Sequence, residues 1–88
     1  MRSFEALFKV PALHRLVPVR SRGQGGRVAT TSWEHEEYAP DGRLIARYLS
    51  QAQHLGNGRT RGAWSKYDPA GKLIAQGFQV PASLAEAA

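Results

Sequence analysis

The chain has 88 residues, of which 42% are hydrophobic, and it contains no cysteine. This length allows one domain with one core, and the lack of cysteine excludes disulfides, thiolate metal sites and cysteine nucleophiles. Residues 1–30 hold six basic residues and one acid, which is the whole formal net charge of +5, because residues 31–88 hold six of each sign. This excess predicts either an anionic partner or a solvated basic face, and we favour the solvated face.

The first segment, residues 1–20, contains an apolar-rich stretch over residues 7–19 that is too short and too charged to span a membrane. It lacks a signal-peptide pattern, so we expect a cytoplasmic protein. The spacing of Phe4 and Leu7 fits a helix, whereas the apolar residues over 4–10 alternate as in a strand. Because two prolines exclude one long helix, we predict two short extended pieces, over residues 4–10 and 14–20.

The next segment, residues 20–27, is basic and rich in glycine, and we expect a loop there. It lacks the Gly-Lys-Ser/Thr and the helix start of a phosphate-binding loop, since strand-forming residues follow it. It is similar to a single copy of the arginine–glycine segments that bind RNA. A solvated connection is the interpretation that we prefer.

Two hairpins with the same turn chemistry follow. Tyr38-Ala-Pro-Asp-Gly-Arg-Leu-Ile-Ala46 and Tyr67-Asp-Pro-Ala-Gly-Lys-Leu-Ile-Ala75 form an internal repeat with an offset of 29 residues. Proline presets φ and glycine follows where φ must be positive, as in a type I turn closed by a glycine bulge. The flanking residues predict four strands, over residues 32–38, 43–51, 63–67 and 72–80, and residues 51–62 are expected to form a flexible connection.

The register counted outward from these turns predicts which side chains share a face. The main core side is expected to hold the pairs Tyr38–Leu44, Glu36–Ala46, Glu34–Tyr48, Tyr67–Leu73 and Ser65–Ala75. The opposite side then collects Trp33, Ile45, Leu49, Trp64, Ile74 and Phe78. Because both sides are apolar, we expect either the N-terminal segment or a second copy of the chain to cover the second side.

The second hairpin carries the pattern Gly62-Ala-Trp64-x-x-Tyr67-x-x-x-Gly71-Lys-Leu-Ile-x-x-Gly77-Phe. It resembles the bacterial variant of the MORN repeat, in which Gly-x-Trp-x-x-Tyr precedes an Asn/Asp-Gly turn and Lys-Leu, and more weakly the YD repeat of Rhs-type proteins. The first copy departs from the pattern, because its Trp lies two residues further from the Tyr and Tyr48 and Leu49 stand where the later Gly is expected. The resemblance covers residues 33–80, and it implies a sheet-building, non-enzymatic module that binds partner proteins or acidic lipids.

No group of titratable residues has the spacing of a catalytic or metal site. The three histidines share no ligand spacing, and of the acids beside His35 only Glu37 lies on its side of a strand, so we interpret them as a surface cluster. Glu34 and Glu36 share a face, but each lies opposite an apolar residue in the predicted register. The two carboxylates are therefore not expected to act as an acid–base pair. We therefore predict no enzyme, no metal and no cofactor.

These features together predict a mainly β fold, a small antiparallel sheet of four to six strands built from the two repeated hairpins, with room for a short terminal helix. We divide the single domain 1–88 into a basic N-terminal segment over residues 1–30, hairpin repeats over 31–53 and 60–80, and a tail over 81–88 that frays.

The function that we expect is a small interaction module that binds a protein partner or a second copy of itself, with no small-molecule substrate. The alternative is a nucleic-acid-binding protein that uses the basic N-terminal third together with aromatic residues of the sheet. The candidate residues for binding a partner or an anion are basic or aromatic, namely Arg15, Arg20, Arg22, Arg27, Arg47, Trp33, Trp64, Lys66 and Phe78.

Overall fold

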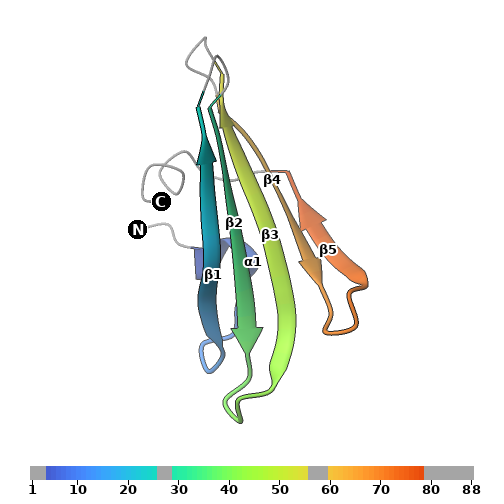
Figure 1. Cartoon of the computed structure of the whole chain (residues 1–88). Coiled ribbons are helices and arrows are strands. Elements are labelled where there is room, and N and C mark those ends of the chain that lie inside the picture. The colour runs from blue at the N-terminus through green and yellow to red at the C-terminus, as the bar shows by residue number, and fades with distance from the viewer. Residues whose placement is uncertain (1–3, 26–28, 56–59, 79–88) are drawn as a thin grey trace.

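The computed structural model describes residues 4–25, 29–55 and 60–78. One short helix, α1 (Phe4–Phe8), precedes five strands, β1 (Arg15–Gln24), β2 (Ala29–Tyr38), β3 (Leu44–His54), β4 (Thr60–Tyr67) and β5 (Leu73–Gly77). Every strand pairs antiparallel with the next along the chain, so the order in the single sheet is β1-β2-β3-β4-β5 (Figure 1). The predicted mainly β fold with a short terminal helix is confirmed. The predicted tail lies outside the described residues.

The prediction of an extended piece over residues 4–10 is wrong, because this segment begins with α1. A strand would place Leu7 on the opposite side from Phe4 and Phe8, whereas a helix places all three on one side. All three pack against the sheet. A helix of five residues is not stable alone, so this contact decides its conformation. The piece predicted over residues 14–20 does lie in a strand, β1.

Where the structure describes them, both segments predicted as loops are largely strand. β1 runs on to Gln24, which pairs with Thr30 of β2, and β3 runs on to His54, which pairs with Thr60 of β4. Glycine and polar residues lower strand propensity here, but the neighbouring strand pairs with their backbone N–H and C=O groups. Pairing across the sheet therefore extends strands into sequence that favours loops.

The two hairpin turns form as predicted. Ala39 N–H donates to the carbonyl oxygen of Arg43 and Asp68 N–H donates to that of Lys72, each at 2.9 Å. Gly42 and Gly71 follow with φ of 87° and 92°, in the region that glycine enters without strain.

The predicted register is wrong beyond the first pair of each hairpin, because each contains a β-bulge. Tyr38 pairs with Leu44 as predicted, but Glu37 then pairs with Ala46, so Ile45 is an extra residue. The second hairpin repeats the shift between its Tyr67–Leu73 and Lys66–Ala75 pairs. A slip of one residue moves every side chain of a strand to the other face. The core side of the first hairpin therefore holds Trp33, His35, Glu37, Ala46 and Tyr48, and the predicted core residues Glu34 and Glu36 lie on the opposite side.

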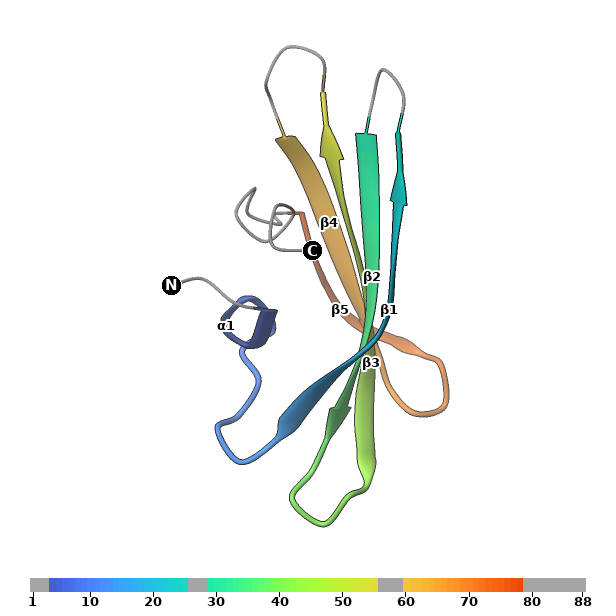
Figure 2. The same cartoon turned by 60° about the vertical axis from the view of Figure 1, so that its left-hand side comes forward.

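The helix packs on one side of the twisted sheet, which we call the covered face (Figure 2). Its core consists of Phe8, Trp33, Ala46, Tyr48 and Ala52, each at most 5% exposed. The N-terminal segment is thus the cover of the face that contains Trp33, one of the two covers predicted. No segment among the described residues lies over the opposite side, which we call the open face (Figure 2).

Candidate binding face

The open face is built from side chains that alternate along each strand with those under α1. Paired residues of neighbouring strands point to the same side, so these side chains form rows across the sheet. One central row is Arg22, Ser32, Gln51 and Ala63, and the adjacent row is Arg20, Glu34, Leu49 and Ser65. The open face is therefore mixed in character, because short side chains at Ser32, Ala63 and Ser65 alternate with longer polar, charged and apolar ones.

Arginines outnumber carboxylates among the strand residues of this face. The strands place five arginines there, which are Arg15, Arg20, Arg22, Arg47 and Arg61, against two glutamates of β2, Glu34 and Glu36. The strand residues of the open face thus carry a net charge of +3. A face of this charge attracts anionic groups.

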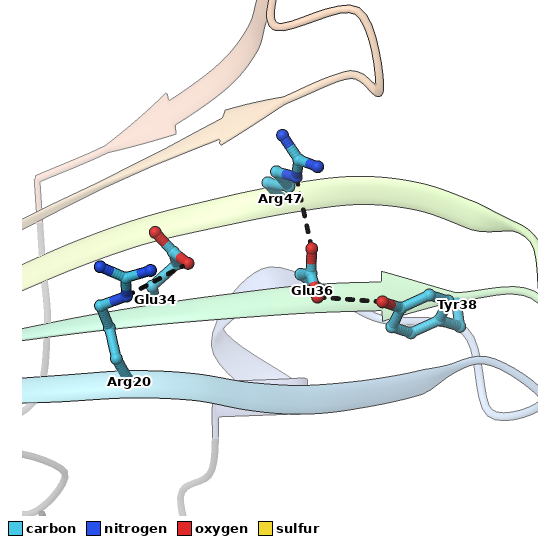
Figure 3. A network of polar contacts seen from close by, with 5 residues as sticks. All are labelled: Arg20, Glu34, Glu36, Tyr38 and Arg47. Carbon is cyan, nitrogen blue, oxygen red and sulfur yellow. Dashed lines mark hydrogen bonds and ion pairs between the residues drawn. The ribbon is translucent and has the colours of Figure 1, made fainter.

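Two of the arginines are already paired with carboxylates (Figure 3). Arg20 Nε lies 3.7 Å from an oxygen of Glu34, and Arg47 Nε donates to Glu36 at 3.3 Å. The hydroxyl of Tyr38 donates to the other oxygen of Glu36 at 2.9 Å, and this hydrogen bond, with partial desolvation, raises the pKa of Tyr38. Exposed pairs of this kind contribute little to stability, so their main effect is to neutralise part of the positive charge of the open face.

Arg22 and Arg61 differ from these two residues. Within the described part of the chain, neither has a carboxylate at ion-pair distance. Both are exposed. No carboxylate of the described residues therefore neutralises the charge of either arginine.

Three adjoining depressions cross the open face, with volumes of about 260, 320 and 310 Å³. The first begins at Arg20 and Arg22, the second lies over Ser32, Ala63 and Ser65, and the third ends at Gln53, Arg61 and Phe78. Neighbouring depressions share wall residues, first Ser32 and Leu49, then Gln51 and Ala63. We call the continuous groove the transverse trough. Its central part is hollow where the short side chains of Ser32, Ala63 and Ser65 adjoin the longer Leu49 and Gln51.

The structure brings some of the predicted binding residues together and separates others. Arg15, Arg20, Arg22 and Arg47 share the open face, and Phe78, which is 75% exposed, lies at one end of the trough. Trp33, Trp64 and Lys66 belong to the covered face, where Trp33 is 5% exposed and the Lys66 ammonium lies 5.5 Å from the ring centre of Tyr48. Arg27 lies outside the described residues.

Sequence reasoning missed Arg61, because it was expected in a loop. The signal that could have found it is the alternation of Arg61, Ala63 and Ser65 with Gly62 and Trp64, which is typical of a strand. Extending the second hairpin by this pattern places Arg61 on the same side as Ser65.

A polar cluster lies under α1, on the covered face, and it corrects the prediction of a surface cluster at His35 and Glu37. Glu37 is 2% exposed; its carboxylate accepts a hydrogen bond from the Tyr48 hydroxyl at 2.6 Å and lies 2.5 Å from Nδ1 of His14. Burial opposes its ionisation, but these hydrogen bonds and the charge of Lys66 hold the pKa of Glu37 below its ordinary value. Burial, and then the hydrogen bond to Glu37, raise the pKa of Tyr48.

His35 lies beside this cluster and is 6% exposed, with its ring centre 4.5 Å from that of Phe4. Burial lowers the pKa of His35 although the charge of Glu5 opposes the shift, so the ring is neutral at neutral pH. No set of three His, Cys, Asp or Glu residues within the described ranges could hold a metal ion. The contact between His14 and Glu37 instead joins the segment between α1 and β1 to the sheet.

Acid should weaken the fold over two pH ranges. The unfolded chain protonates its histidine near the ordinary pKa of 6.5, but folded His35 binds that proton only at lower pH, so stability falls as pH drops below about 6.5. Glu37 stabilises the fold above its ordinary pKa of 4.5, and this contribution is lost as pH falls through the lower pKa of the folded state. Urea unfolding between about pH 8 and about pH 2 measures both losses.

Two variants separate these ranges. His35→Phe, which keeps an aromatic ring beside Phe4, should remove the loss that begins near 6.5, and Glu37→Gln should remove the loss below 4.5. A wild-type stability that stays constant from neutral pH down to about pH 5 would contradict the assignment to His35.

No described helix has the length and apolar character needed to cross a membrane. In comparisons with protein-family models, curated proteins and solved structures, nothing matches this chain. The resemblance of residues 33–80 to MORN and YD repeats therefore stays a prediction.

Proposed function

We propose that the protein is a non-enzymatic interaction module whose open face binds a protein partner. The observation that carries the proposal is the asymmetry of the sheet, since α1 packs on one face only. On the other face Leu49 is 46% exposed, in the wall of the trough and in the same row as Arg20. Apolar groups that adjoin arginine are typical of surfaces that bind proteins.

Nucleic acid is the second candidate, because four of the arginines predicted to bind an anion share the open face, whose strand residues carry a net charge of +3. Two observations weigh against it. Glu34 and Glu36 place carboxylates between the arginines of β1 and Arg47 of β3, where they would repel phosphates. Trp33 and Trp64, the rings best suited to stack on bases, belong to the covered face.

Site-specific photo-cross-linking tests the proposal. A photoreactive residue in place of Leu49, in cells that express the protein from its native locus, should give a discrete protein adduct. The matched control is the same residue in place of Leu13, which is 80% exposed but lies in the connection between α1 and β1. The captured protein, once purified, should bind wild type and the Leu13→Lys variant equally. Leu49→Lys should weaken that binding about tenfold or more, because it buries an unpaired charge.

The adduct distinguishes the alternatives. An adduct with a second copy of the chain indicates the self-associating form of the module, and an adduct that nuclease destroys indicates the second candidate. Equal yields from Leu49 and Leu13 would contradict a binding role for the open face.

A further inference from the structure

We infer that the transverse trough receives an extended segment of the partner that carries two carboxylates four residues apart, one at Arg22 and the other at Arg61. The inference rests on the proposed function and names the chemistry of the partner. It follows from the spacing of the two arginines, from the charges between them and from the shape of the trough.

The spacing comes from the register. Arg22 lies in one row with Ser32, Gln51 and Ala63, so three strand separations of about 4.8 Å, about 14 Å in all, lead from β1 to β4. Arg61 lies two residues from Ala63 along β4, a step of about 7 Å. The two Cα atoms are thus about 16 Å apart. In an extended peptide, residues four apart lie about 14 Å from each other and point to the same side, and two arginine side chains span the difference.

The charges along the trough favour a ligand that carries negative charge at only two positions. Arg22 and Arg61 have no ion-pair partner within the described residues, whereas Arg20 is paired with Glu34. Glu34 itself lines the trough. A nucleic acid carries a phosphate at every residue and would place one beside Glu34. A peptide can carry neutral residues there, so charge complementarity favours a peptide over a nucleic acid.

The remaining walls favour neutral residues between the two carboxylates. Short side chains at Ser32, Ala63 and Ser65 leave room for a backbone to approach the sheet, and Leu49 offers an aliphatic contact. Gln51 lines the same part of the trough. Its amide both donates and accepts hydrogen bonds, as an extended backbone requires.

A titration of the ¹⁵N-labelled full chain with a capped peptide of about eight residues tests the inference. The peptide places two glutamates four residues apart among valine, serine and threonine, and its isomer places them side by side. The spaced peptide should shift the amide signals of Ser50 and Gly62, which line the trough. It should bind about two- to fivefold more tightly than the isomer, as an exposed ion pair allows.

The variants Arg22→Gln and Arg61→Gln should each weaken binding of the spaced peptide about two- to fivefold. Arg43→Gln is the matched control, because Arg43 is exposed in a hairpin turn outside the trough, and it should leave the affinity unchanged. Arg22→Glu should restore affinity for a peptide in which lysine replaces the glutamate that faces this end.

Equal binding of the two isomers, or binding that neither arginine variant affects, would overturn the inference. So would a single-stranded oligonucleotide of about eight residues that binds the trough more tightly than the spaced peptide, which would indicate nucleic acid instead. If these tests fail while the Leu49 cross-link to a protein persists, the open face binds a partner of other chemistry. If the cross-link also fails, the proposed function is wrong as well.

Discussion

Replacing Phe8 with alanine should lower the free energy of unfolding by about 3–5 kcal/mol, as expected when a buried phenylalanine is truncated. Phe8 is 5% exposed and stacks on Tyr48 with ring centres 4.1 Å apart. Its ring also packs edge-to-face against the ring of Trp64, with ring centres 5.3 Å apart. Because α1 has only five residues, its position depends on such contacts, and their loss exposes the covered face.

Urea unfolding followed by tryptophan fluorescence measures this effect, since Trp33 and Trp64 both lie in or beside the core. Leu13→Ala is the control, because this leucine is 80% exposed; its effect should stay within about 0.5 kcal/mol. A loss of less than about 1 kcal/mol for Phe8→Ala would mean that α1 does not hold the core together.

Replacing Gly77 with valine should destabilise the protein by about 1–3 kcal/mol through overpacking. A Cβ atom at Gly77 would lie 2.6 Å from Cε2 of Trp64 and closer still to Nε1, so the ring has to move. The ring cannot move freely, because Trp64 contacts Phe8 and lies 6.4 Å from the ring centre of Tyr48. Movement of Trp64 should therefore disturb both the β4–β5 pair and the packing of α1.

Gly23→Ala is the matched control, since no atom lies within 4 Å of the added methyl group and the residue lies in β1. Its effect should lie between neutral and a gain of about 1 kcal/mol. Thermal unfolding with tryptophan fluorescence compares the two variants. A Gly77→Val protein with wild-type stability and an unchanged fluorescence maximum would contradict the close contact.

The close contact between Trp64 and Gly77 explains why the motif of the second hairpin combines a tryptophan with a glycine. Trp64 and Gly77 are cross-strand partners, and the ring occupies the space that a side chain at position 77 would need. At the repeat offset of 29 residues, His35 and Tyr48 take these places in the first hairpin and are also paired. The imidazole of His35 is smaller than the indole of Trp64, and position 48 carries a tyrosine where position 77 carries glycine. The first copy thus departs from the repeat pattern at Tyr48, whose hydroxyl donates a hydrogen bond to buried Glu37.

The candidate binding face was only partly predictable. Arg20 and Arg22 were placed among anion-binding residues by charge alone, and the structure does bring them to one surface with Arg47. Trp33 is a candidate because it is an aromatic residue predicted to lie opposite Leu49 on the second side of the sheet, but the bulge pairs it with Ser50, on the covered face. The sequence shows which residues are charged, whereas the face of the sheet on which a residue lies depends on the register of the paired strands.

The amino-acid sequence by itself determined the two turns, the repeat, the antiparallel hairpins and the β class, because proline, glycine and β-forming residues act over a few neighbouring positions. Three features were decided only by the tertiary structure. The bulges moved β3 and β5 by one residue relative to their neighbours, pairing across the sheet extended β1 and β3, and packing on Trp33 and Tyr48 made residues 4–8 helical. Each depends on contacts between residues distant in the chain, which local propensity does not contain. These contacts leave one face of the sheet covered by α1, whereas no described segment lies over the other face, which carries the trough and the arginines.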